Sequence, residues 1–337
     1  MNLYIVNFLG IFFFSFLLSL LFLKKKLLLN FSGNNHQKFT SNSQVPLIGG
    51  LIIFLVIFSM PYFTVVSKLA FLLILLAGIL SDLKYLNSPK TRLFFQFIIV
   101  SLFLITEQIN LVYTNLFFLD LLLQNFLFSI LFTTFCFLII INGSNFLDGI
   151  NLLVIGYYLS ITLILCILID KNFIFLDNIS IINIIVVLLV LLFFNLVNRI
   201  YLGDSGSYLL GFLYSLILVN FYIKNTSISP FFIILLLWYP GLENLFSIFR
   251  RSFIKKSPLN PDIKHLHQLI YEYFKKKVFF NNKILINNFP GFLIILYNFI
   301  MMFFATFFIL NSKILLLIIF FNISLYCYLY YLLIKKR

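Results

Sequence analysis

A polar stretch between two long apolar runs carries the residues best suited to chemistry. Residues Asn142–Asn151 read Asn-Gly-Ser-Asn-Phe-Leu-Asp-Gly-Ile-Asn and lie between the apolar runs Leu121–Ile141 and Leu152–Ile169. Short polar side chains on a glycine-containing backbone can approach a phosphate or a metal ion closely. A charged Asp inside a membrane span costs roughly 2.5–3.5 kcal/mol on insertion scales, so we expect Asp148 at a membrane face. Taken alone, the stretch also fits a solvated hairpin between two helices.

Two glycine-containing segments place further acids beside hydroxyl or basic residues. Tyr201–Ser207 reads Tyr-Leu-Gly-Asp-Ser-Gly-Ser. Such a turn can aim a carboxylate and backbone amides at a phosphate or Mg²⁺, or cap the helix that follows. Gly78–Lys84 ends an apolar run with Asp82, and Ser88–Arg92 opens the next run with basic residues. This pair of segments fits a capped helix entry, or an acid held near three cations at the level of the lipid headgroups.

The last polar loop, Phe249–Lys283, contains a His-x-His motif among basic residues. His265 and His267 follow the basic pair Arg250 and Arg251. Two His at this spacing diverge on a helix and share a face only on an extended segment, so the motif is weak evidence for a metal. Beside several cations it fits anion binding better, because Arg, Lys and His donors recognise diphosphate.

The polar residues also indicate which cofactor to expect. Carboxylate and amide oxygens without thiolate ligands favour Mg²⁺, or Mn²⁺, over zinc. Mg²⁺ beside a cationic loop at a bilayer surface indicates diphosphate chemistry on a lipid substrate.

The chain around these segments has the composition of a membrane protein. Of its 337 residues, 62% are hydrophobic and 10% are charged, and the mean hydropathy is +1.09. Apolar runs near the ~20 residues of a membrane-spanning helix recur throughout. This predicts an all-α, polytopic transmembrane bundle in a single integral membrane domain, residues 1–337. The predicted spans, about eleven in number, cover residues 3–23, 45–63, 65–80, 93–109, 122–141, 152–169, 179–197, 207–223, 230–248, 289–310 and 314–334. The three cysteines lie in apolar runs without metal or redox spacing, so we interpret them as core residues.

The distribution of basic residues predicts the orientation of this bundle. With the N-terminus outside, 20 of the 24 Lys and Arg residues fall on one face, which the positive-inside rule assigns to the cytoplasm. The C-terminus and the loop 249–283 lie on that face too. Even numbers of spans separate the polar motifs, so they are expected at the same cytoplasmic surface. The net charge of +14 then reflects topology and attraction to the lipid bilayer, not binding of nucleic acid.

In this order the motifs resemble those of the polyprenyl-phosphate N-acetylhexosamine-1-phosphate transferases. The segments that carry the resemblance are Val45–Gly50, Gly78–Asp82 with Ser88–Arg92, Asn142–Asn151, Tyr201–Ser207 and Ser257-Pro258…Pro261-Asp262…His265-Leu266-His267. The resemblance covers about residues 45–270. By span number and orientation it is similar to the branch that starts O-antigen, common-antigen and teichoic acid lipids, in lipopolysaccharide and cell wall biosynthesis. It implies a Mg²⁺-dependent enzyme of the bacterial cytoplasmic (inner) membrane. That enzyme transfers a sugar 1-phosphate from a UDP-sugar to polyprenyl (undecaprenyl) phosphate and releases UMP.

The resemblance also implies roles for individual residues. The residues implied in catalysis are Asp82, Asp148, Asp204 and His265. Those implied in holding the metal are Asp204 and Asn145. Uracil would stack on Tyr201 and hydrogen-bond to Asn151. The phosphates would be bound by basic residues and imidazoles, namely Lys84, Lys90, Arg250, Arg251, His265 and His267.

Three positions depart from the family pattern. Gln268 replaces a third His, Asn151 replaces an Asp, and Ser81 stands where the first of two adjacent Asp residues is usual. Ser81 implies that Asp82 or Asp148 engages the lipid phosphate instead, or that the protein is a catalytically weakened, structural member of a polysaccharide-assembly system.

Other questions stay open at this point. A membrane transporter is the alternative from another class, although the acids gather at one face and no internal repeat is visible. A direct displacement and a covalent phospho-Asp route are both compatible with these residues. The identity of the sugar and the oligomeric state, with a homodimer among the alternatives, are also left open.

Overall fold

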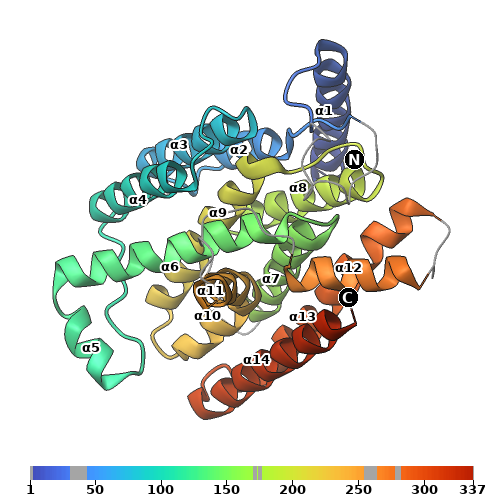
Figure 1. Cartoon of the computed structure of the whole chain (residues 1–337). Helices are drawn as coiled ribbons and strands as arrows, with labels where there is room; N and C mark the ends of the chain where they lie inside the picture. Colours follow the sequence, from blue (N-terminus) through green and yellow to red (C-terminus); the bar gives the residue numbers. More distant parts are fainter. Residues whose placement is uncertain are drawn as a thin grey trace.

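The chain forms a bundle of α-helices with no β-sheet among the described residues (Figure 1), which confirms the predicted all-helical class. This computed structural model describes residues 3–30, 44–169, 173, 177–253, 264–277 and 282–336. The elements, in chain order, are α1 (Leu3–Lys25), α2 (Gly49–Ser59), α3 (Val65–Asp82), α4 (Pro89–Thr106), α5 (Phe117–Leu123), α6 (Phe126–Leu147), α7 (Leu153–Ile169), α8 (Asn178–Leu196), α9 (Gly203–Lys224), α10 (Pro230–Leu236), α11 (Trp238–Phe253), α12 (Leu266–Lys276), α13 (Lys283–Ala305), the 3-10 helix η2 (Thr306–Phe308) and α14 (Ser312–Lys335).

Fewer helices than expected are long enough to cross a membrane by themselves. In the described part of the chain, eight are long and apolar enough, and the bent pair α10–α11 makes a ninth if it is one span. The other two predicted spans correspond to α2 and α7, which are apolar but only 11 and 17 residues long. A helix needs about 20 residues to span the hydrocarbon core. By length and composition, the described part of the chain thus holds eight or nine candidate spans of a multi-pass membrane protein, and α2 and α7 fall short of the predicted length.

The shortness of α2 has a local cause. The residues just before it are extended, because Pro46 pairs with Leu29 and its carbonyl accepts a hydrogen bond of 3.0 Å from the Tyr201 amide. The Gly49 amide in turn donates to the Tyr201 carbonyl at 3.1 Å. The helix then ends just before Pro61, which has no amide hydrogen with which to continue it. This predicted span is thus partly an extended segment that ties the N-terminal region to the start of α9.

The break between α10 and α11 follows from a proline. The two helices are bent by 75°, and Pro240, in the first turn of α11, cannot donate a hydrogen bond to the Leu236 carbonyl four residues earlier. The Tyr157 hydroxyl donates to that carbonyl instead, at 2.8 Å. Beyond the bend, α11 is a strongly amphipathic helix that packs beside α6.

Helix α9 is the centre of the bundle. It is buried along most of its length, and α2, α3 and α6 pack around it, as Figure 1 shows. The close approach of α3 depends on Gly78, because a Cβ at this position would lie 2.3 Å from the Ser205 Cα. Only a residue without a side chain lets the two backbones meet at this point. The contact brings the end of α3, with Ser81 and Asp82, against the first turn of α9.

The predicted cytoplasmic loop 249–283 is partly helical. Helix α11 continues to Phe253, and α12 occupies Leu266–Lys276. The Ser257-to-Asp262 part of the motif, with Lys255 and Lys256, lies outside the described residues.

Candidate active site

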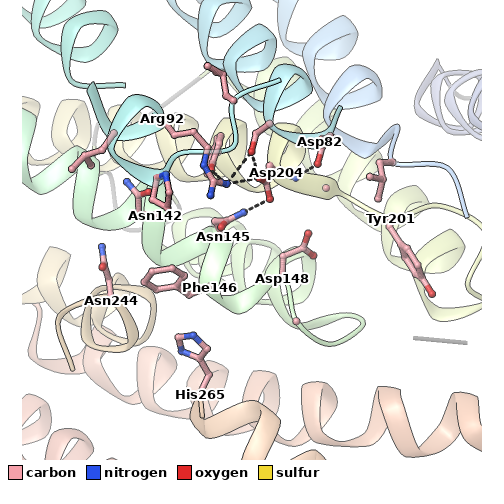
Figure 2. A pocket seen from close by; sticks show the side chains of 18 of the residues that line it. Asp82, Arg92, Asn142, Asn145, Phe146, Asp148, Tyr201, Asp204, Asn244 and His265 are labelled. Atoms are coloured by element: carbon pink, nitrogen blue, oxygen red, sulfur yellow. Dashed lines mark hydrogen bonds and ion pairs between the residues drawn. The ribbon is translucent and has the colours of Figure 1, made fainter. Parts of the chain in front are cut away.

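A cavity of about 860 Å³ collects most of the residues that the sequence singled out. Its walls come from the ends of α3 and α6, the starts of α4, α9 and α12, and one side of α11 (Figure 2). Nine of the twelve predicted site residues line it: Asp82, Lys84, Asn145, Asp148, Asn151, Tyr201, Asp204, Arg251 and His265. The other three, Lys90, Arg250 and His267, are not among its lining residues.

Asp204, in the first turn of α9, is the cavity carboxylate that side chains from several helices contact. Its Oδ2 pairs with Arg92 Nη1 at 3.0 Å and accepts a hydrogen bond from the Ser81 hydroxyl. Its Oδ1 accepts a hydrogen bond of 2.7 Å from Asn145 Nδ2. Side chains from α3, α4 and α6 therefore converge on one carboxylate, as Figure 2 shows.

Arg92 is a site residue that sequence reasoning missed. It was interpreted as a cation on the cytoplasmic side, whereas its Nη1 also lies 2.9 Å from the Ser81 hydroxyl and 3.4 Å from the Tyr208 hydroxyl. Its place three residues after Pro89, at the start of a helix that follows Asp82, was the available signal. Arg92 supplies a fixed positive charge in the wall of the cavity.

Asp82 has a structural task in this arrangement. Its Oδ1 accepts from the Asp204 amide at 2.8 Å, and its Oδ2 accepts from the Ser205 amide at 3.1 Å. A carboxylate that receives the first amides of a helix is stabilised by those hydrogen bonds and by the positive end of the helix dipole. Asp82 thus caps α9 from a neighbouring helix while it also lines the cavity.

Asp148 is the carboxylate whose environment least favours its charge. It follows the last residue of α6 and lines the cavity between that helix and Asp204. Burial, together with the carboxylates of Asp204 and Asp82, raises the pKa of Asp148 well above its ordinary value. A raised pKa makes the Asp148 carboxylate a stronger base than an ordinary Asp.

The two residues predicted to bind uracil belong to an asparagine network at one end of the cavity. Asn151 Nδ2 donates to Asn198 Oδ1 at 2.6 Å and to Asn288 Oδ1 at 3.0 Å. The Tyr201 hydroxyl donates to the same Asn198 Oδ1 at 3.0 Å. Asn151 and Tyr201 are largely buried, and the network ties the turn after α6 to α8 and α13.

The His-x-His motif splits between the cavity and the protein interior. His265 lines the cavity, with its ring centre 5.1 Å from that of Phe146. His267 is fully buried, and its ring nitrogens make no hydrogen bond with any residue that the structure describes. Burial lowers the pKa of His267 below its ordinary value, although Glu243 acts in the opposite direction. The sequence could not separate the two, because it did not reveal that α12 begins between them.

The two predicted arginines also diverge. Arg251 is 7% exposed and lines the cavity. Arg250 bonds to the Lys264 carbonyl and to the Tyr330 hydroxyl, and its guanidinium lies 5.4 Å from the Tyr330 ring centre. Consecutive residues on a helix point about 100° apart, so one arginine faces the cavity and the other faces α14.

Two further asparagines, Asn142 and Asn244, line the cavity to the left of Asp204 in Figure 2. Asn142 donates to Gln96 Oε1 at 2.9 Å, and Asn244 donates to the Ile139 carbonyl at 2.9 Å. These bonds join α6 to α4 and to α11.

The cavity has the donor chemistry of a magnesium site without a complete set of ligands. In the described part of the chain, no group of three or more His, Cys, Asp or Glu residues is arranged to hold a metal ion. Mg²⁺ is usually bound by one or two carboxylates together with phosphate oxygens of a substrate rather than by a protein cage. The hard oxygens of Asp204 and Asn145 fit such a shared site. The carboxylates of Asp82 and Asp204, which raise the pKa of Asp148, add negative charge in the same cavity.

Comparison with known proteins points to one family. The model of glycosyl transferase family 4 matches residues 64–222, from the start of α3 to near the end of α9. An undecaprenyl-phosphate alpha-N-acetylglucosaminyl 1-phosphate transferase of Thermotoga maritima is 38% identical over 71 residues. That alignment covers 21% of this chain and 23% of the relative, which is less than a quarter of its length. The family match includes the three cavity carboxylates and does not reach the His-x-His motif.

Proposed function

The chain belongs to glycosyl transferase family 4, and on this basis we propose that it transfers a sugar 1-phosphate from a UDP-sugar to undecaprenyl phosphate. The sugar is of the N-acetylhexosamine type, and the second product is UMP. The observation that carries the proposal is the convergence of Asp82, Asp148, Asp204 and His265 on one cavity with Arg92 and Arg251. The T. maritima relative, named for this type of transfer, supports the substrate class.

The reaction is a displacement at phosphorus. A lipid phosphate oxygen attacks the β-phosphorus of the UDP-sugar, and the bond from that phosphorus to the bridging oxygen of the UMP moiety breaks. The products are polyprenyl diphosphate–sugar and UMP. The main tasks of the protein are to align the two phosphates and to offset their negative charge.

The cavity residues divide these tasks among them. Asp148 takes the proton of the lipid phosphate, because its raised pKa suits a base. Arg92, Arg251 and His265 bind phosphate oxygens, and the exposed Lys84 in the cavity wall binds the lipid phosphate. Uracil lies against Tyr201 beside Asn151. We assign no substrate contact to Lys90, Arg250 or His267.

Asp204, with Asn145, would hold the Mg²⁺ ion. When bound, Mg²⁺ (or Mn²⁺ in its place) neutralises charge on the diphosphate and on the departing UMP. In the structure Asp204 is paired with Arg92, whose guanidinium lines the same cavity and would help to neutralise the phosphates beside the ion.

The reaction takes place at the cytoplasmic face of the bacterial inner membrane. The predicted orientation, with the N-terminus outside and the C-terminus inside, places the basic residues and the cavity on this face. A polyprenyl chain would remain in the bilayer while its phosphate enters the cavity.

An assay of UMP release tests the proposal. Purified protein in detergent would be given UDP-N-acetylglucosamine or UDP-N-acetylgalactosamine, polyprenyl phosphate and Mg²⁺. Release of UMP that requires all three components supports the transferase. No release from any donor, by protein that remains monodisperse, would favour the structural role suggested by Ser81.

A further inference from the structure

Glu243 is a buried carboxylate that the proposed reaction does not use. It lies in α11 and is 1% exposed. A buried charge is costly unless it is paired and hydrogen-bonded. Among the described residues, the imidazoles of His265 and His267 face the Glu243 carboxylate.

Both carboxylate oxygens of Glu243 hold the start of α12. Oε2 lies 2.9 Å from His265 Nδ1. Oε1 accepts the Leu266 amide at 3.1 Å and lies 3.8 Å from His267 Nδ1. One side chain of α11 thus fixes three consecutive residues at the point where the His-x-His segment enters the site.

The arrangement determines which nitrogen of His265 is available to a ligand. Because Nδ1 faces Glu243, the opposite nitrogen, Nε2, is the one that can meet a molecule in the cavity. The ring is held between Phe146 and His267, with ring centres 5.1 Å and 5.6 Å away. Figure 2 shows His265 facing the cavity on the side of Phe146.

A second contact holds the segment from the other side. His267 and Gln268 pack on the turn after α6, where a Cβ on Gly149 would lie 2.8 Å from His267 Nε2. The His265–Gln268 segment is therefore clamped between Glu243 and the turn that begins with Asp148.

We propose that Glu243 is a positioning residue, which keeps His265 as the Nδ1–H tautomer with Nε2 directed at the phosphates of the UDP-sugar. A carboxylate that accepts from one ring nitrogen fixes the tautomer and the orientation of the imidazole, so that the other nitrogen meets the ligand in a defined state. The proposal rests on the proposed function for the identity of the ligand. The hydrogen bond itself does not depend on it.

A double-mutant cycle separates positioning from simple support of the fold. Rates of UMP release would be compared for the wild type, Glu243→Gln, His265→Ala and the double variant. We expect Glu243→Gln to lower kcat/KM by about 10- to 100-fold. We expect it to have little further effect once His265 is absent, because the carboxylate acts through that ring. Losses that multiply in the double variant, or a wild-type rate in Glu243→Gln, would overturn the proposal.

Two further variants guard against a folding defect. Glu243→Asp keeps the carboxylate and should retain more activity than Glu243→Gln, whereas the reverse order would contradict the proposal. Glu107→Gln makes the same substitution at the end of α4, where Glu107 accepts a hydrogen bond from Thr64 away from the cavity. This control should keep the wild-type rate, and all variants should show the same elution volume in detergent.

A spectroscopic measurement tests the hydrogen bond without the reaction. In protein labelled with ¹⁵N-histidine, the His265 signals would be assigned by their loss in His265→Gln. A protonated Nδ1 is expected, and an unprotonated Nδ1 would overturn the proposal whatever the activity. If Nδ1 is protonated but no donor yields UMP, the proposed function fails while the positioning of His265 by Glu243 stands.

Discussion

Asp204 is held by three side chains that approach it from different helices. Arg92 balances its charge, Ser81 donates a hydroxyl hydrogen bond, and Asn145 donates an amide hydrogen bond. An Asp at position 81 would put a second negative charge beside the same oxygen, where Ser81 instead bridges Arg92 and Asp204. The substitution that departs from the family pattern is therefore compatible with an ordered carboxylate in the protein without metal.

Removing the charge of Asp204 should remove most of the activity. We expect Asp204→Asn to lower the rate of UMP release by at least about 100-fold, because the substitution removes the carboxylate that would hold the Mg²⁺ ion, and with it the neutralisation of charge on the reacting phosphates. The control is Asp120→Asn in α5, where Asp120 accepts a hydrogen bond of 2.6 Å from the Thr114 amide outside the cavity. Near-normal turnover of Asp204→Asn would defeat the metal assignment.

Asp148 should make the protein less stable at neutral pH than a neutral side chain would. Burial and two neighbouring carboxylates raise its pKa above the ordinary 3.8. As the pH rises above that ordinary value, Asp148 loses its proton in the unfolded chain but keeps it in the folded protein. The free energy of unfolding therefore falls with rising pH until the raised pKa is reached. Asp148→Asn stays neutral throughout. It should therefore melt at a higher temperature than the wild type at pH 7, without metal.

The pH dependence distinguishes this effect from better packing. The difference in melting temperature should shrink as the pH falls and should disappear well below the ordinary value of 3.8, where Asp148 is protonated in the unfolded chain as well. Asp148→Asn should also lose most of its UMP release, because the amide cannot accept the proton of the lipid phosphate. A variant that is less stable than the wild type at pH 7 would contradict the raised pKa.

Several side-chain roles could be predicted from the sequence and several could not. Asp82, Asp148 and Asp204 were expected on one face because even numbers of apolar runs separate them, and they line one cavity. That Asp82 caps α9 depends on the contact of two helices 120 residues apart in the chain, which no local pattern contains. The contact of Glu243 with the His-x-His segment could not be predicted either, because no local pattern links α11 to the start of α12.

The contact between α3 and α9 determines where the carboxylates of Asp82 and Asp204 lie. Gly78 allows it, since a Cβ there would lie 2.7 Å from the Ser205 amide nitrogen and 2.3 Å from the Ser205 Cα. The atoms that would have to move belong to the backbone of the central helix, which cannot yield as a flexible side chain would.

Gly78→Ala should therefore destabilise the protein, by about 1–3 kcal/mol as is usual for an overpacked interior, and should reduce activity by displacing Asp82 from α9. Thermal unfolding in detergent measures the first effect and UMP release the second. Gly10→Ala in α1 is the matched control, because no atom lies within 4 Å of the added Cβ. Equal losses of stability and activity in the two variants would contradict the role of the α3–α9 contact.

The helices themselves were predicted better than their lengths. All eleven predicted spans coincide with apolar helices or with the bent pair α10–α11. Hydropathy did not reveal that the residues around Pro46 pair with Leu29 and Tyr201, which shortens α2. It also gave no warning that Pro240 would bend its span by 75°. Both features depend on backbone hydrogen bonds, and a sliding average of hydropathy contains no information about them.

The orientation of the whole bundle stays a prediction of the positive-inside rule. Cysteines introduced at Lys84 and Lys224, after replacement of the three native cysteines by alanine, would report it by labelling of intact spheroplasts with an impermeant maleimide. We expect Lys224→Cys to react from outside and Lys84→Cys to react only after permeabilisation. Labelling of Lys84→Cys from outside would place the cavity on the wrong face for a UDP-sugar.

The path of one phosphorus atom tests the central claim most directly. UDP-N-acetylglucosamine or UDP-N-acetylgalactosamine labelled with ³²P at the β-phosphorus would be incubated with the protein, undecaprenyl phosphate and Mg²⁺, and the products separated into lipid and aqueous fractions. Transfer of a sugar 1-phosphate predicts label in the lipid fraction, as a lipid diphosphate, with unlabelled UMP in the aqueous fraction. Label released as UDP, or none transferred from either donor, would contradict the account.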